Sequence, residues 1–271
     1  MNIYIRCVSL LILFVALTLS GNVEAGNVEA PEGVEVNAGI ETTSYSLTED
    51  WSAGIPESGE KAFWITRKGK NIGFHYMTFK PRGNQLHVDI HIEIGVKIGF
   101  IPVFGYVHHN KEIWQDGQLI SMESRTDNNG TIEFANITRN AQGQLISNSS
   151  KYSGKLEKAQ LTTSYFNPNF IRQSHVISTQ DGRELEIEAY EVGLSTLNAA
   201  SRTVEARRFR LVGDLPLDIW YTPKGEWIRS AFLPAGDNVN NVDPLSRGDV
   251  LTYEDAMVKD LPARSAWRSL N

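Results

Sequence analysis

The segment from Leu86 to Ile98, Leu-His-Val-Asp-Ile-His-Ile-Glu-Ile-Gly-Val-Lys-Ile, decides the fold of this chain. Apolar side chains occupy every second position, and polar or small residues occupy the positions between them. A period of two places alternate side chains on opposite faces of a β-strand, whereas a helix requires a period near 3.6. The segment therefore predicts a long strand with one buried face, in which Gly95 is the expected bend point.

Similar but shorter segments surround this strand. Upstream, 62–66 and 72–79 are rich in aromatic residues and are separated by a glycine-bearing turn, which predicts a hairpin. Downstream, Asp-Gly, Asn-Gly and related turns separate the remaining apolar segments, with strands expected at 106–114, 119–126, 131–138, 144–152, 175–178, 184–190, 203–212, 217–221 and 226–232. Consecutive strands joined by short turns predict an all-β fold, an up-and-down antiparallel meander forming a strongly curved sheet, half-barrel or barrel. An outer-membrane barrel is the less favoured alternative, because the strands differ in length.

The N-terminal residues 1–25 have the pattern of a signal peptide. One basic residue, Arg6, precedes a short apolar run, and Val23-Glu24-Ala25 ends in a small residue suited to cleavage. The apolar run is shorter than the roughly 20 residues that span a bilayer, so a retained anchor is less favoured. The pentapeptide Gly-Asn-Val-Glu-Ala is repeated, which makes Ala30 an alternative cleavage site. We therefore expect a periplasmic or secreted protein that is not an integral membrane protein after cleavage.

Three further regions follow from composition. Residues 26–59 are rich in Gly, Glu, Asn, Ser and Pro and predict a flexible leader. Residues 60–232 form the expected antiparallel β domain, with a short helical turn near Asn167-Pro168-Asn169. Residues 233–271 predict a polar C-terminal tail, in which 249–253 is the one candidate for an edge strand.

Cysteine usage and charge narrow the function classes. The only cysteine is Cys7, inside the signal segment, so the processed chain has no disulfide, thiolate ligand or cysteine nucleophile. This usage fits a bacterial periplasm. The formal net charge of −6 argues against nucleic acid or an anionic membrane surface as partner. No phosphate loop or dinucleotide motif is present, and we expect no cofactor.

The segment 106–114 carries the main candidate site. Tyr106, His108, Glu112 and Trp114 share one face of the predicted strand and mix aromatic with titratable groups. Such a face can line a pocket in which His108 and Glu112 act as an acid/base pair. It can also be a polar ladder hydrogen-bonded within the sheet, which we favour because no nucleophile or metal motif accompanies it. Further candidate ligand-binding residues are the aromatics Tyr165, Trp220 and Tyr221, although the last two also fit the core of a hairpin.

Two other features have a functional and a structural interpretation. His87, Asp89, His91 and Glu93 share one strand face and could ligate zinc, but the polar face of an amphipathic strand needs such residues anyway, so no metal site is predicted. The apolar segment 99–105 is either a lip that touches lipid or a partner, or a bend buried at the end of the barrel.

Several short motifs together resemble an uncharacterised bacterial family of exported proteins, a domain of unknown function. They include Ile72-Gly73-Phe74-His75, the segment 96–104, Ser164-Tyr165-Phe166-Asn167-Pro168 and Trp220-Tyr221. The resemblance covers 63–232 and implies export and an all-β fold but no reaction. The wider pattern is similar to curved-sheet envelope proteins such as the periplasmic lipoprotein carriers. Phe166, where the pattern has tryptophan, and the long polar tail depart from it.

These observations favour a non-catalytic protein that binds an apolar small molecule, a lipid or an envelope protein. A concave β surface rich in aromatics suits such binding, and no complete catalytic constellation is evident. A hydrolase-like enzyme using His108 and Glu112 is the first alternative, and a structural envelope component is the second.

Overall fold

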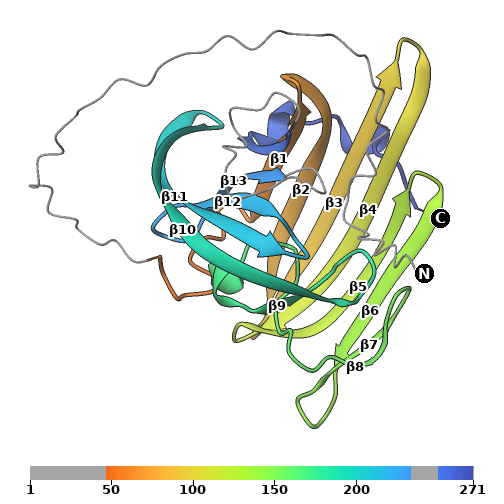
Figure 1. Ribbon diagram of the computed structural model, residues 1–271, viewed down its shortest axis with the longest axis vertical. Coiled ribbons are helices and arrows are strands. Elements are labelled where there is room, and N and C mark those ends of the chain that lie inside the picture. Colours follow the sequence, from red (N-terminus) through yellow and green to blue (C-terminus); the bar gives the residue numbers. More distant parts are fainter. Residues whose placement is uncertain (1–46, 233–249, 271) are drawn as a thin grey trace, which may run out of the picture.

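The computed structural model describes residues 47–232 and 250–270. The described chain forms fourteen strands, drawn in Figure 1: β1 (Glu60–Arg67), β2 (Lys70–Arg82), β3 (Gln85–Ile98), β4 (Ile101–Gln115), β5 (Gln118–Asn128), β6 (Thr131–Arg139), β7 (Leu145–Ser149), β8 (Ser153–Lys155), β9 (His175–Ile177), β10 (Glu184–Ala199), β11 (Arg202–Gly213), β12 (Leu217–Tyr221), β13 (Trp227–Phe232) and β14 (Leu251–Ala256). The helical segments of this part of the chain are short 3-10 turns.

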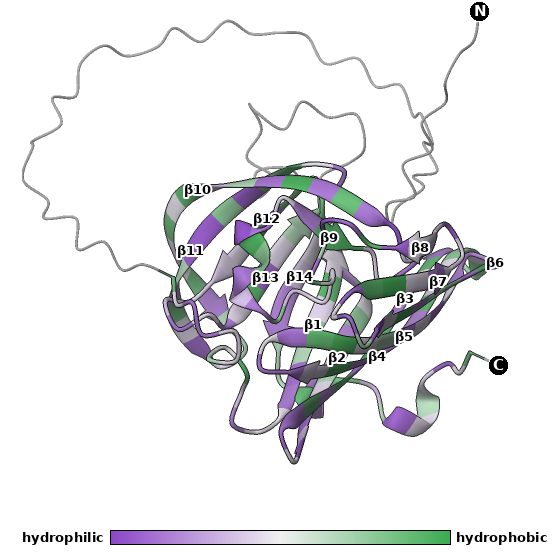
Figure 2. Ribbon diagram, turned by 90° about the horizontal axis from the view of Figure 1, so that it is seen from below, coloured by the Kyte–Doolittle hydropathy of each residue, from purple (hydrophilic) through white to green (hydrophobic). Residues whose placement is uncertain are grey.

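All fourteen strands belong to one antiparallel sheet. Its order is β8-β7-β6-β5-β4-β3-β2-β1-β14-β13-β12-β11-β10-β9. Strands that follow one another in sequence are therefore also neighbours in the sheet, except β8 and β9, which form its two edges, and the first and last strands, β1 and β14, pair with each other. The alternation of apolar and polar residues is visible as bands of colour along β10 and β11 (Figure 2). The predicted all-β, curved antiparallel meander is confirmed. Among the described strands no ladder joins the two edges β8 and β9, so strand pairing leaves the sheet open.

The prediction that the C-terminal tail contributes an edge strand is wrong. β14 lies inside the sheet and pairs with both β1 and β13, where Tyr253 stands opposite Ile65 and Ser230. Without β14, the sheet would divide into two runs of strands, β1–β8 and β9–β13. β1 and β13 would then each present an unpaired edge. Leu251 and Tyr253 bury their side chains in the core, which explains why this polar tail returns to the sheet.

The predicted flexible leader is also partly wrong. Leu47 is buried, and its carbonyl accepts a hydrogen bond from Arg172. The Trp51 ring stacks on Trp114 with 6.4 Å between ring centroids. Residues 47–59 therefore cover the core, because their few apolar side chains find partners that composition alone does not reveal. Residues 26–46 lie outside the described residues.

A long connection, residues 156–183, fills the concave side of the sheet, and we call it the plug. Leu161, Tyr165, Phe166, Phe170 and Ile177 of the plug are buried in the main hydrophobic core. Its helical turn η1 (Pro168–Arg172) is capped by the Asn167 side chain, which accepts a hydrogen bond from the Asn169 backbone N–H. The helical turn predicted at this position is confirmed.

The convex side carries the last described residues. Two 3-10 turns, η3 (Val258–Asp260) and η4 (Arg264–Ala266), lead to Trp267, whose ring stacks on His91 at 4.7 Å between centroids. The Arg268 side chain donates hydrogen bonds to the carboxylate of Glu93 and to the backbone oxygens of Ile94 and Tyr106. This end of the chain is thus attached to the back of β3 and β4.

The apolar segment 99–105 is not a buried bend. It forms the tip and one arm of the β3–β4 hairpin, where Phe100 is fully exposed (101%) and Ile98 and Ile101 are mostly exposed (58% and 68%). The hairpin extends past the neighbouring strands and so leaves the core (Figure 1).

Candidate functional site

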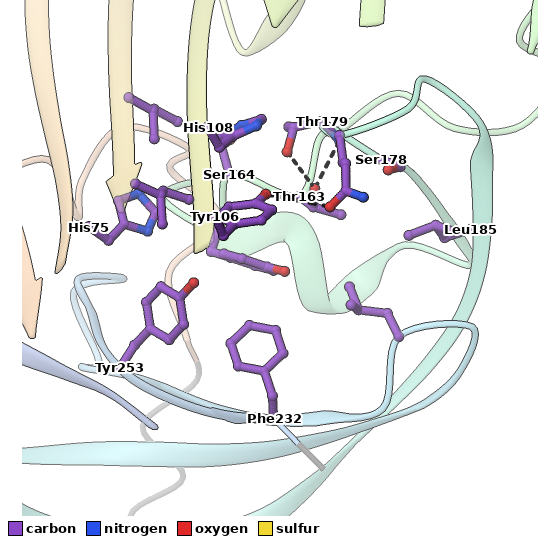
Figure 3. A pocket seen from close by; sticks show the side chains of 15 residues that line it. His75, Tyr106, His108, Thr163, Ser164, Ser178, Thr179, Leu185, Phe232 and Tyr253 are labelled. Atoms are coloured by element: carbon purple, nitrogen blue, oxygen red, sulfur yellow. Dashed lines mark hydrogen bonds between the residues drawn. The ribbon is translucent and has the colours of Figure 1, made fainter. Parts of the chain in front are cut away.

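A cavity of about 70 Å³ lies between the concave face of the sheet and the plug. The sheet contributes His75 from β2, Tyr106 and His108 from β4, and Tyr253 from β14. Each of these side chains lies on the concave face because its partner across the β-ladder is an apolar core residue: Phe63 for His75, Ile94 for Tyr106, Ile92 for His108 and Ile65 for Tyr253. The plug closes the cavity with Thr163, Ser164, Tyr165 and the segment 178–180. Figure 3 shows how the two groups of side chains face the shared space.

His75 is the most unusual residue of this lining. Its ring is buried (2% exposed), and neither ring nitrogen has a hydrogen-bond partner among the described residues. The rings of Phe63, Trp227 and Tyr253 surround it with centroids 5.4–5.8 Å away. Burial, reinforced by His108 and His91, lowers the pKa of His75 to about 3. The imidazole is therefore neutral at pH 7 and offers one donor and one acceptor that the protein leaves unused.

His108, in contrast, has a partner. Its Nδ1 lies 2.8 Å from Oγ1 of Thr126, which is the residue opposite it on β5. Burial, with the histidines His109 and His91 nearby, lowers the pKa of His108 to about 3. A neutral imidazole with so low a pKa is a weak general base.

Glu112 belongs to a different hydrogen-bond network. Its carboxylate accepts hydrogen bonds from Asn110 Nδ2 and Trp114 Nε1, both at 2.8 Å, and from Ser164 Oγ of the plug at 3.2 Å. Burial raises the pKa of Glu112, against the opposing effect of these donors. Among the described contacts, no hydrogen bond joins Glu112 to His108. The arrangement is the polar ladder that the sequence favours, extended from β4 to the plug.

The predicted aromatic residues fall in three places. Tyr165 lines the cavity, and its backbone, with φ of +64°, is held by the Tyr221 hydroxyl, which donates to the Tyr165 carbonyl at 2.7 Å. Trp114 packs between Trp51 and Phe166, at the end of the core beyond Glu112. Trp220 points to the other side of its strand and packs in a separate cluster with Leu197, Ala199, Ala206, Ile228, Ala231 and Val250. The structure therefore gathers Tyr106, His108 and Tyr165 at the cavity and places Trp220 elsewhere.

Sequence reasoning missed His75 and Tyr253. A signal for His75 exists in the sequence, because it occupies the same strand face as the core residues Met77 and Phe79. A polar residue at an apolar position of an alternating strand indicates a buried polar group. Tyr253 gave no such signal, because its strand lies in a segment that appears irregular.

The residues considered for a metal site lie on the convex face. His91 Nε2 is 2.8 Å from Glu93 Oε1, and the His91 ring is covered by Trp267 and by His109 at 4.4 Å. Within residues 47–232 and 250–270, no three His, Cys, Asp or Glu side chains come together in a group suited to a metal ion. His91 here takes part in an aromatic stack on the back of the sheet.

A known protein family matches most of this chain. The family described as "Domain of unknown function (DUF6134)" matches residues 63–241. The chain belongs to the DUF6134 family. The resemblance to an uncharacterised domain family is thereby confirmed, over nearly the same residues.

Solved structures similar to this DUF6134 protein include one from another family of unknown function. It is the crystal structure of a beta-barrel-like protein of the domain of unknown function DUF1849 from Brucella abortus, with a TM-score of 0.49 and 10% sequence identity. The match covers 73% of the DUF6134 chain and 94% of the other. No curated protein matches the sequence.

Proposed function

We propose that this protein is a non-catalytic periplasmic binding protein whose cavity, between the concave sheet and the plug, takes up a neutral, largely apolar ligand. The single observation that carries the proposal is His75, a buried imidazole that faces the cavity with both nitrogens unpartnered among the described residues. A polar group left unsatisfied in the interior costs about 1–3 kcal/mol. A ligand with a hydroxyl or amide group would satisfy it.

The lining indicates the charge of this ligand. The side chains around the cavity combine aromatic and aliphatic groups with neutral imidazoles, phenols and hydroxyls, and no Lys, Arg, Asp or Glu is among the described lining residues. Burial raises the pKa of Tyr106 and of Tyr253, so both phenols stay protonated. Because a charged ligand would lose its hydration without gaining an ionic partner, the site favours a neutral molecule.

The size of the cavity sets a further requirement. Pockets for drug-sized ligands have volumes of roughly 300–1,000 Å³, and the cavity here measures about 70 Å³. In this proposal the plug segments that line the cavity, 163–165 and 178–180, shift away from the sheet when the ligand enters. The plug stays anchored through its strand β9, which pairs with β10. Its segment over the cavity is joined to the sheet by side-chain hydrogen bonds such as Ser164 to Glu112 and Ser124 to the Thr179 carbonyl, which can break and re-form.

The cellular location belongs to the same proposal and rests on the signal-peptide pattern of residues 1–25, which lie outside the described residues. Among the residues that the structure describes, no helix is long and apolar enough to cross a bilayer.

Native mass spectrometry of wild-type and variant protein, each purified from the producing cells, tests the proposal. We expect a small neutral molecule in the wild type, which is lost in His75→Phe because phenylalanine fills the ring space without hydrogen-bonding groups. His87→Phe, the same change on the convex face, is the control and keeps the ligand. Wild-type protein that contains no small molecule, or a His75→Phe protein that retains it, would contradict the proposal.

A further inference from the structure

The end of the β3–β4 hairpin, residues 95–105, stands apart from the sheet, and we call it the ribbon. β2 makes its last rung with β3 at Gly73–Ile94, and β5 makes its last rung with β4 at Asn128–Tyr106. Beyond these rungs the ribbon strands pair only with each other, from Gly95–Gly105 to Ile98–Ile101. At about 3.3 Å per residue the ribbon projects roughly 13 Å beyond its neighbours, as Figure 1 shows for the upper end of β3 and β4.

The tip of the ribbon is apolar and open to solvent. Phe100 is fully exposed, and Ile98 and Ile101 on either side of it are more than half exposed. Elsewhere on β3, the apolar residues Leu86 to Ile94 on the concave face are at most 9% exposed. Three adjacent large apolar side chains at a projecting tip do not contribute to the core, and such clusters mark interaction sites.

The base of the ribbon is held firmly. The Arg268 guanidinium donates to the backbone oxygens of Ile94 and Tyr106, one on each arm. Asn129 clamps the adjacent Gly105 through two hydrogen bonds, one from its backbone N–H and one to its side-chain oxygen. These contacts fix the ribbon against the sheet, so its apolar tip is presented in a defined direction.

The charges near the tip are mostly positive. Lys97 is the only charged residue of the ribbon. The adjacent β1–β2 turn, Arg67-Lys68-Gly69-Lys70, lies at the same end of the sheet, and its Lys68 and Lys70 are exposed. Neither segment contains an acidic residue, although the whole chain carries a formal charge of −6. The end of β5, next to the β5–β6 turn and on the other side of the ribbon, adds one acidic residue, Asp127. The net local charge is still positive, opposite in sign to the overall charge.

We propose that the ribbon tip docks on a lipid bilayer whose surface carries anionic headgroups. Phe100, Ile98 and Ile101 enter the boundary between headgroups and acyl chains, which lies within roughly 5–10 Å of the surface. The lysines remain at the headgroup level and pair with phosphates, as long basic side chains do at membrane interfaces. The surface is independent of the cavity and extends the proposed function to a protein that works next to a membrane.

The experiment measures co-sedimentation of the purified, cell-processed protein with vesicles of phosphatidylcholine alone or mixed with phosphatidylglycerol. We expect binding to the mixed vesicles, and Phe100→Ser lowers it about tenfold because one buried aromatic side chain is lost. Leu194→Ser is the matched control: Leu194 is 61% exposed on β10, and its replacement leaves binding unchanged. Replacing Lys68 and Lys70 together by Glu lowers binding to the mixed vesicles only.

Several outcomes would overturn the inference. Phe100→Ser protein that sediments with vesicles as the wild type does would show that the tip is not the membrane contact. A lysine variant that binds mixed vesicles normally would exclude the anionic headgroups. Loss of a dimer in Phe100→Ser, with no vesicle binding by the wild type, would assign the tip to a second copy. Thermal melting is unchanged in Phe100→Ser because this ring lies outside the core, and the cavity ligand is retained, so failure here is distinct from failure of the cavity proposal.

Discussion

The Ser164 hydroxyl donates a 3.2 Å hydrogen bond to Oε2 of Glu112, and this bond joins the plug to the concave face of β4. The same carboxylate accepts hydrogen bonds from Asn110 and Trp114 on its own strand. A buried acidic group with several donors holds together two parts of the chain that are more than fifty residues apart. The Glu112 carboxylate thus positions the plug above the cavity.

Two replacements of Glu112 test this role. Glu112→Gln keeps the shape and a carbonyl acceptor, so we expect a loss of at most about 1 kcal/mol in the free energy of unfolding. Glu112→Ala leaves the Asn110, Trp114 and Ser164 donors without an acceptor, and we expect a loss of about 1–3 kcal/mol. Thermal and urea unfolding of both variants measure the difference.

The same pair of variants distinguishes the alternative function. An acid/base role for Glu112 requires a group that titrates, which an amide cannot provide. A Glu112→Gln protein that is as stable as the wild type, but fails to complement a deletion strain, would favour the hydrolase-like alternative over a binding protein.

The second prediction concerns pH and His75. The pKa of His75 in the folded protein is about 3, below the value of about 6.5 for an unfolded chain. As pH falls below 6.5, the unfolded chain therefore binds a proton that the folded protein does not, and the free energy of unfolding decreases. Between pH 7 and pH 5 the contribution of this one histidine amounts to about 2 kcal/mol.

Urea unfolding of wild-type and His75→Phe protein at both pH values isolates this contribution. We expect the loss of stability from pH 7 to pH 5 to be about 2 kcal/mol smaller in the variant. His175→Phe, a change at a partly exposed residue of β9, should leave the difference between the two pH values almost as in the wild type. If His75→Phe loses as much free energy of unfolding between pH 7 and pH 5 as the wild type, His75 takes up its proton inside the folded protein, which contradicts the prediction.

The third prediction concerns the central position of β14. Lys61 of β1 is buried and lies 2.6 Å from Asp255 of β14 and 2.7 Å from Glu226, the residue before β13. Lys61→Met leaves Asp255 without its buried cation, whereas Glu226 keeps the Arg202 guanidinium at 2.6 Å, so we expect a loss of about 3 kcal/mol. Lys68→Met, on the exposed β1–β2 turn, is the control and changes stability by less than about 0.5 kcal/mol. Denaturant unfolding of both variants measures these values, and equal stabilities would argue against β14 as an inner strand.

The fourth prediction concerns the cover over the convex face. Burial lowers the pKa of His91, whose ring is stacked under Trp267. Trp267→Ala admits water to this ring, so we expect the pKa of His91 to rise towards its ordinary value. The loss of stability should be about 1–2 kcal/mol, because the indole ring is only partly buried. Nuclear magnetic resonance titration of the His91 ring follows the pKa directly, and a pKa that stays low without the indole would show that Trp267 is not its cover.

Much of the sheet was predictable because its information is local. The alternation in β3 and the glycine-bearing turns between strands depend on residues next to one another, and these set strand direction and pairing for most of the meander. The shared face of Tyr106, His108, Glu112 and Trp114 was predictable for the same reason. Its split into two networks was not, because the partners Thr126 and Ser164 come from elsewhere in the chain.

The sequence by itself determined that this chain forms an antiparallel β meander with one apolar face and lacks a recognisable catalytic motif. Only the tertiary structure decided that β14 lies in the middle of the sheet, that residues 156–183 fill its hollow and that His75 is left unpartnered beside a cavity. The physical reason is that alternation and turn chemistry act between neighbouring residues. Inserting β14 into the sheet, filling the concave side and burying a polar group depend instead on contacts between segments that lie more than fifty residues apart in sequence. The direction of Phe100 has the same origin: an apolar residue in a turn is exposed or buried according to what packs against the turn, and among the described residues nothing covers this one.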